Sequence, residues 1–262
     1  MTDCQTFIDA STYIANWLTK QPSVKEESLT DWLLFEISSK IPRVRYVSFS
    51  RYVEARKTGA DWEWWFLYPG GSYRYRVQAK KASPNGDNYP SIAYTNQHGL
   101  QIDKLISDSK NANAIPAYVF YSASSSPLGS KCGGGVAAKG AFSVGAQNIY
   151  SEFIAGGKVV VSETDILQIS IPLQCFTCCP LGRKSTSQSM DSFIDRYFSE
   201  EREIFTDENA RDIRPGFHAK LPSYVTALLE NAEGVPEWWH REYQSQMEEF
   251  NALVIYDLRD RT

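Results

Sequence analysis

The feature that most constrains the fold is a pair of aromatic-rich segments joined by a short turn sequence. Residues 61–68 read Asp-Trp-Glu-Trp-Trp-Phe-Leu-Tyr, residues 73–81 read Tyr-Arg-Tyr-Arg-Val-Gln-Ala-Lys-Lys, and residues 69–72 between them read Pro-Gly-Gly-Ser. Aromatic and β-branched residues favour strands, whereas Pro and Gly favour turns. The sequence therefore predicts a β-hairpin with a four-residue loop, in which Tyr68 lies opposite Tyr73.

This predicted hairpin gathers four polar side chains on one face. Counting back from the loop, Asp61 lies opposite Lys80, and Glu63 lies opposite Gln78. Because side chains alternate between the two faces of a strand, these four point to one side and the large apolar side chains point to the other. Such a polar cluster is costly to bury without a compensating partner, and a divalent cation is such a partner.

The elements predicted around the hairpin indicate an α/β protein. Apolar residues at helical spacing predict helices at 6–20, 27–40 and 96–110, and compact apolar runs predict strands at 45–50 and 116–123. From residue 27 onward the order is α, β, β, β, α, β. This order is the core of the fold that we expect.

The remainder of the chain is predicted to be mainly helical. We expect, in order, a Ser- and Gly-rich loop (122–145), a short helix (146–155), an apolar strand-like run (166–176), three helical patterns (187–205, 221–232 and 237–250) and a closing strand (252–258). A turn-rich break near residue 180 separates a core, residues 1–180, from a C-terminal extension, residues 181–262. Apolar content on both sides of the break favours one continuous domain.

The polar face of the hairpin has the groups that phosphodiester hydrolysis requires. A cation polarises the phosphoryl oxygen and lowers the pKa of the attacking water, and a nearby amine orients that water or offsets developing charge. Asp61, Gln78 and Lys80 offer these groups. Magnesium takes hard oxygen ligands and keeps several waters, so one or two carboxylates, an amide and the carbonyl of Ala79 suffice as ligands.

These residues resemble the motif of the PD-(D/E)xK, or restriction-endonuclease-like, nuclease superfamily. In that superfamily an α-β-β-β-α-β core, a mixed sheet flanked by helices, carries an acidic residue on the second strand and an (E/Q)xK triplet on the third. Here Asp61 follows Gly59-Ala60, and the triplet is Gln78-Ala79-Lys80. The resemblance covers about residues 25 to 123.

The resemblance implies further site residues. Many members add a glutamate from the helix before the sheet, for which Glu27 is the candidate and Glu36 the alternative. Several use polar groups from the helix after the third strand, where Gln97, His98 and Gln101 stand. The triplet begins with Gln78 in place of an acidic residue, so we expect Glu63 to supply the missing charge as a metal ligand.

The resemblance also implies a function. It predicts a deoxyribonuclease that depends on Mg²⁺ or Mn²⁺ and that acts in bacterial restriction or antiphage defence, with a second copy or another defence protein as a partner. DNA is the expected substrate, and RNA stays open. The alternative is a catalytically silent relative whose polar face binds nucleic acid or a protein, in which Asp61 and Lys80 form an ordinary cross-strand ion pair of about 0–1 kcal/mol.

Positive charge is concentrated around the hairpin. Residues 40–81 contain ten basic and three acidic residues, a net charge of +7, whereas the whole chain carries −4. This stripe, interleaved with tyrosines, suits a phosphate backbone, and Arg56, Lys57 and Lys81 are its candidate substrate-binding residues. A solvated sheet face that carries long side chains is the plainer interpretation of the stripe.

Cysteine usage and hydropathy bear on location. Five cysteines, an odd number, and a start that does not resemble a secretory signal predict reduced thiols in the cytoplasm and no disulfides. Cys175, Cys178 and Cys179 form a CxxCC group, which is better explained by buried free cysteines than by a zinc site. No apolar run approaches the roughly 20 residues that cross a bilayer, so no membrane segment is expected.

Overall fold

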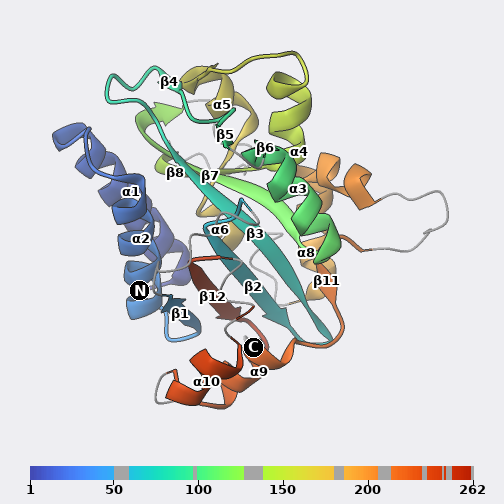
Figure 1. Cartoon of the computed structure of the whole chain (residues 1–262). Coiled ribbons are helices and arrows are strands. Elements are labelled where there is room, and N and C mark those ends of the chain that lie inside the picture. The colour runs from blue at the N-terminus through green and yellow to red at the C-terminus, as the bar shows by residue number, and fades with distance from the viewer. Residues whose placement is uncertain are drawn as a thin grey trace.

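A mixed β-sheet with helices on both faces forms the centre of the molecule, an α/β architecture (Figure 1). The computed structural model describes residues 1–49, 59–96, 99–126, 138–179, 186–205, 214–231, 235–243, 245 and 250–260. Within these ranges, seven strands follow the order β1-β12-β2-β3-β7-β8-β10, and β11 pairs with β3. Their bounds are β1 Val44–Ser48, β2 Trp62–Tyr68, β3 Gly71–Lys81, β7 Ile115–Ser126, β8 Ala138–Gly145, β10 Ile171–Pro172, β11 Phe217–His218 and β12 Ala252–Asp257.

The predicted hairpin is present, but its register differs from the prediction. β2 and β3 pair from Trp62 opposite Val77 to Tyr68 opposite Gly71. Gly70 has a positive φ of 84°, a conformation that glycine adopts without steric cost, so a two-residue turn suffices. The four-residue loop was therefore wrong, and so were the pairings derived from it.

The last strand of the chain lies inside the sheet. β12 pairs in parallel with β2 and antiparallel with β1, so it separates two strands that are neighbours in the predicted order. The strand predicted at 252–258 is confirmed, and the C-terminal part of the chain contributes an interior strand of the sheet besides its helices.

The order of elements around the hairpin is also confirmed. The helix predicted at 27–40 is α2 (Glu26–Lys40), and α1 (Asp3–Lys20) precedes it. α3 (Gln101–Asn111) connects β3 to its parallel neighbour β7. It begins five residues later than predicted, because residues 95–96 and 99–100 form the short strands β5 (Thr95–Asn96) and β6 (Gly99–Leu100).

Apolar side chains of the two sheet faces build separate cores. One face packs against α1, α2, α6 (Cys175–Cys178) and α8 (Ser187–Tyr197). The other face packs against α3, α4 (Ala146–Ile149) and α5 (Glu163–Ile169), and, near the C-terminus, against α9 (Ser223–Glu230) and α10 (Glu237–Glu242). Figure 1 shows α1 and α2 on one side of the sheet and α3 on the other. The remaining short elements are β4 Asn88–Tyr89, β9 Val161–Ser162, a π-helix at Tyr150–Ile154 and a 3₁₀-helix at Ser199–Phe205.

Two other expectations were wrong. The apolar run 166–176 is not one strand, because its first part belongs to α5, which Ser162 caps by accepting from the Asp165 amide, and strand β10 is limited to Ile171–Pro172. The loop predicted at 122–145 overlaps the end of β7 and the whole of β8, whose inward-facing side chains pack into the core.

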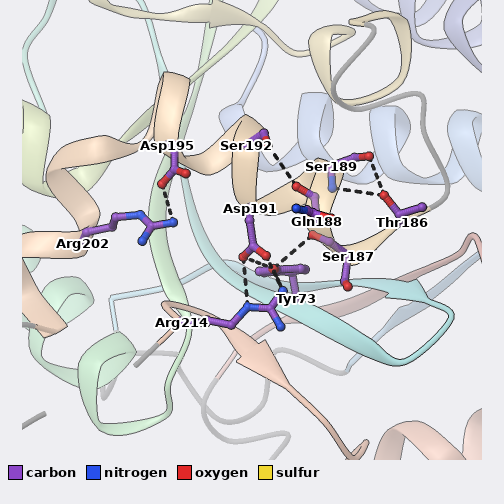
Figure 2. A network of polar contacts seen from close by, with 10 residues as sticks. All are labelled: Tyr73, Thr186, Ser187, Gln188, Ser189, Asp191, Ser192, Asp195, Arg202 and Arg214. Atoms are coloured by element: carbon purple, nitrogen blue, oxygen red, sulfur yellow. Dashed lines mark hydrogen bonds and ion pairs between the residues drawn. The ribbon is translucent and has the colours of Figure 1, made fainter. Parts of the chain in front are cut away.

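A polar clamp fastens α8 to the sheet (Figure 2). Arg214 donates from Nη2 to the Tyr73 hydroxyl at 2.7 Å and from Nε to Asp191 Oδ1 at 3.2 Å. The Tyr73 hydroxyl also contacts Asp191 and lies 3.2 Å from the Ser187 carbonyl oxygen. Burial, followed by the hydrogen bond to Asp191, raises the pKa of Tyr73. We call Tyr73, Asp191 and Arg214 the α8 clamp.

The cysteine prediction also needs correction. Cys4 of α1 and Cys178 of α6 form a disulfide, although 174 positions separate them. Packing of α1 against α6 brings the two together, and spacing along the chain does not reveal it. Cys175 and Cys179 are buried free thiols, as expected, and Cys132 lies outside the described residues.

Among the described residues, no helix is long and apolar enough to cross a membrane.

Candidate active site

The candidate site lies where β3 extends beyond the start of β2. β2 begins at Trp62, so the end of β3 lacks a strand partner on that side, and its backbone N–H groups need other acceptors. The N–H of Ala79 donates to Asp61 Oδ2 at 2.8 Å, and the N–H of Lys81 donates to Glu26 Oε2 at 2.7 Å. Two carboxylates are thus held side by side along the strand edge.

A chain of side-chain hydrogen bonds begins at Asp61. Gln78 Nε2 donates to Asp61 Oδ2 at 2.6 Å, and Gln78 Oε1 accepts from Gln101 Nε2 at 2.8 Å. The chain ends where Lys80 Nζ donates to Gln101 Oε1 at 2.9 Å. Gln78 and Lys80 are only 3% and 5% exposed, so these two side chains are shielded from water, whereas Asp61 and Gln101 are partly exposed. The predicted grouping of Asp61, Gln78 and Lys80 is present, with Gln78 between the other two.

Glu26 is a site residue that the sequence prediction missed. Burial raises the pKa of its carboxyl to about 7; nearby Lys80 lowers it and nearby Asp61 raises it further. The predicted residue, Glu27, lines the same pocket but is exposed. Glu26 and Glu27 are adjacent at the start of α2, so spacing alone does not tell which one points to the strand end. The alternative, Glu36, forms an ion pair with Lys40 at 2.5 Å.

An acidic pocket opens beside the strand edge. Glu26, Glu27, Thr30, Asp31, Asp61, Asn251 and Ala252 line it. Its walls come from α2, the start of β2 and the start of β12, and the Asn251 N–H donates to the Asp61 carbonyl oxygen at 2.8 Å. The insertion of β12 into the sheet therefore completes the site.

Glu63 does not belong to this site, contrary to the prediction. It pairs with Arg76 across the hairpin, and Arg74 Nε donates to its Oε2 at 2.8 Å. Trp65 Nε1 donates to Glu63 Oε1 at 2.7 Å, and the Tyr224 hydroxyl donates there too. Complete burial works to raise the pKa of Glu63, but the two arginines outweigh it and hold the pKa low. We call Glu63, Arg74, Arg76 and Tyr224 the closed cluster; it leaves Glu63 no role as a metal ligand.

Much of the predicted basic stripe is occupied with internal contacts. Arg74 and Arg76 belong to the closed cluster, and Arg45 donates to the carbonyl oxygens of Leu228 and Asn231. Lys81 Nζ donates to the Pro22 carbonyl oxygen at 2.6 Å, and partial burial lowers its pKa. These groups do not form a continuous phosphate-binding surface. Arg56, Lys57, Gln97 and His98 lie outside the described residues.

The donor set at the strand end fits a hard cation. In the described part of the chain, no group of three or more His, Cys, Asp or Glu side chains is arranged to hold a metal ion. Magnesium, however, is often bound by one or two carboxylates with its remaining positions taken by water and substrate. Glu26 and Asp61 supply two carboxylates at one strand edge, and Gln78 and the Ala79 carbonyl supply further oxygens nearby.

Comparison with known proteins assigns the chain to a family. The profile of the family of unknown function DUF6615 matches residues 3–260, almost the full length. The chain belongs to the DUF6615 family. No curated protein and no solved structure matches it.

Proposed function

We propose that the protein is a Mg²⁺- or Mn²⁺-dependent phosphodiesterase, a deoxyribonuclease of the PD-(D/E)xK type. One observation carries the proposal: Asp61 and Glu26 are held side by side at the end of β3, next to the ammonium group of Lys80. Carboxylates that line a pocket beside a lysine and accept from backbone N–H groups are arranged as metal-assisted hydrolysis requires. We call Glu26, Asp61, Gln78, Lys80 and Gln101 the open site.

The arrangement of elements supports the proposed fold. α2, β1, β2, β3, α3 and β7 follow in the order of a restriction-endonuclease-like core, with β2 and β3 antiparallel and β3 and β7 parallel. β12, which lies outside the segment that the resemblance covers, is inserted between β1 and β2 in the sheet. A role in restriction or antiphage defence rests on analogy at the level of the fold. A cytoplasmic location stays a prediction of the sequence.

Each residue of the open site has a role in the proposed mechanism. Asp61 and Glu26 would hold the cation, with the side-chain oxygen of Gln78 or the Ala79 carbonyl as a further ligand. The cation supplies polarisation of the phosphoryl oxygen and a lower pKa for the attacking water. Lys80, whose ammonium group has three N–H donors, orients that water and offsets the negative charge that develops on the phosphoryl oxygens.

A cleavage assay tests the proposal. Supercoiled plasmid, linear duplex, single-stranded DNA and RNA are incubated with Mg²⁺, Mn²⁺ or EDTA. We expect cation-dependent cleavage of DNA, reduced about 10²–10³-fold in Lys80→Ala, the range for loss of one group that stabilises developing charge. Lys110→Ala, an exposed lysine on α3, is the control. Full activity of Lys80→Ala with an unchanged melting temperature contradicts the mechanism.

One observation favours a second candidate, a silent module that binds nucleic acid or a protein. Gln78 contributes no charge, and its Nε2 rather than its oxygen faces Asp61. This candidate predicts salt-sensitive DNA binding without cleavage and no calorimetric heat on titration with Mg²⁺ or Mn²⁺. Heat of binding together with cleavage excludes it.

A further inference from the structure

The two ends of the hydrogen-bond chain in the open site dictate how both amides are oriented. The ammonium group of Lys80 has only donors, so the Gln101 atom that faces it must be the oxygen. The Gln101 nitrogen therefore donates to Gln78, and the Gln78 atom that accepts this hydrogen bond must be its side-chain oxygen. The Gln78 nitrogen is left for the carboxylate of Asp61, an acceptor.

This orientation conflicts with cation binding by Gln78. A cation shared with Asp61 needs the Gln78 oxygen, whereas the nitrogen now occupies that side. If the Gln78 amide reverses, its nitrogen faces Gln101, which must then turn its oxygen toward Gln78. Gln101 would present its nitrogen to the ammonium group of Lys80, and two donors cannot bond to each other. Ligation by Gln78 and the Lys80–Gln101 hydrogen bond therefore exclude one another.

We propose that Gln101 is a positioning residue that couples the reversal of Gln78 toward a divalent cation to the release of Lys80 from its resting hydrogen bond. The inference rests on the proposed function. In the resting arrangement, Lys80 is held against α3 by the Gln101 oxygen and is buried. In the reversed arrangement, its ammonium group is available to the attacking water. Because coupling between two events is reciprocal, holding Lys80 in place also opposes cation binding.

Gln101→Met tests this coupling by cation affinity without DNA. Methionine keeps the length of the side chain but lacks the amide that bonds to Gln78 and Lys80, so Gln78 can turn without the loss of a Lys80–Gln101 hydrogen bond. We expect Gln101→Met to bind Mn²⁺ about 3- to 10-fold more tightly by calorimetry, since one hydrogen bond of ordinary net strength no longer opposes ligation. A melting curve of each variant verifies folding.

A double-mutant cycle with Lys80→Met separates the coupling from charge. Removal of the Lys80 charge favours a cation in any background, but removal of the orienting hydrogen bond matters only when Gln101 is present. Lys80→Met should therefore tighten Mn²⁺ binding more in the wild type than in Gln101→Met. Gln101→Glu gives an independent check: its carboxylate holds Lys80 and accepts from a reversed Gln78, so it should tighten Mn²⁺ binding while slowing DNA cleavage.

The outcomes distinguish this inference from the proposed function. Equal Mn²⁺ affinity in wild type and Gln101→Met, or weaker affinity in the variant, overturns the coupling and leaves the proposed function in place. An additive cycle also overturns the coupling. Absence of any Mn²⁺ and Mg²⁺ binding in wild type and variant alike overturns both.

Discussion

Two polar groups on the same face of one hairpin differ in how their charges are balanced. In the closed cluster, the buried carboxylate of Glu63 is surrounded by two guanidinium groups, an indole and a phenol. In the open site, the carboxylates of Asp61 and Glu26 accept mainly from backbone N–H groups and the Gln78 amide. The first is balanced by fixed ions, whereas the second faces a pocket, and Lys80 and Lys81 lie near Glu26.

This difference distinguishes a carboxylate that stabilises the fold from one that is available to bind a cation. A buried carboxylate with two arginines has no capacity left for a cation, and its low pKa keeps it ionised as part of the core. A carboxylate with neutral partners keeps its affinity for a cation, and the pKa of Glu26 near 7 reports that its environment stabilises the charge poorly.

The largest expected effect is on the stability of the closed cluster. Glu63→Gln removes the Glu63 carboxylate from the buried guanidinium groups of Arg74 and Arg76, which costs about 3–5 kcal/mol for a broken buried pair. Urea unfolding measures the loss. Glu26→Gln is the matched control, because it neutralises a carboxylate of the open site, and it should not destabilise the protein at pH 8 in EDTA. A loss under about 1 kcal/mol in Glu63→Gln contradicts a structural role for the cluster.

The second effect is on the pH dependence of stability without metal. The folded pKa of Glu26 is about 7 and its ordinary value is 4.5, so the folded protein holds this proton more tightly. The contribution of Glu26 to the free energy of unfolding is therefore full below pH 4.5 and is lost as pH rises through 7. The loss is at most about 3 kcal/mol. In EDTA, the difference in unfolding free energy between wild type and Glu26→Gln should change over this window; a constant difference contradicts the raised pKa.

A smaller effect distinguishes Glu26 from its neighbour Glu27. Because Glu26 lies at the strand edge, Glu26→Gln should weaken Mn²⁺ binding about 10- to 100-fold, the range typical of damage to a metal site. Glu27→Gln should weaken it far less, since Glu27 is exposed. Calorimetry on the two variants decides which glutamate binds the cation. A larger loss of Mn²⁺ affinity in Glu27→Gln would restore Glu27, the residue predicted from the sequence.

The smallest effect lies outside both groups, in the α8 clamp. Tyr73→Phe removes one hydroxyl and leaves the pair of Asp191 and Arg214 intact, so unfolding should become easier by about 0.5–1.5 kcal/mol. Cleavage should be unchanged, because the clamp is far along β3 from the open site. If Tyr73→Phe loses cleavage without losing stability, the α8 clamp takes part in catalysis, contrary to this prediction.

Much of the open site was predictable because strand periodicity is short-range. The alternation of side chains placed Asp61, Gln78 and Lys80 on one face, and that grouping survived because the observed register differs from the predicted one by two residues, which leaves the faces unchanged. The prediction of which residues lie directly opposite one another did depend on the register. Gly70 allowed a tighter turn, so Trp62 lies opposite Val77, and Glu63 lies opposite Arg76.

The remaining features arise from packing between distant segments. Whether Glu26 or Glu27 reaches β3 is set by the rotation of α2 against the sheet. The position of β12 and the Cys4–Cys178 disulfide each join parts of the chain separated by well over a hundred residues. Neither leaves a periodic or compositional signal in one sequence.

The most direct test of the central claim is plasmid cleavage in Mg²⁺ by Asp61→Asn beside the wild type. Asparagine keeps the size of the side chain and an oxygen acceptor for the Ala79 N–H, so the fold should persist while the charge for the cation is lost. We predict cleavage by the wild type in Mg²⁺, none in EDTA and none by Asp61→Asn with an unchanged melting temperature. Cleavage by a folded Asp61→Asn at the wild-type rate, or no cation-dependent cleavage by the wild type, would contradict the account.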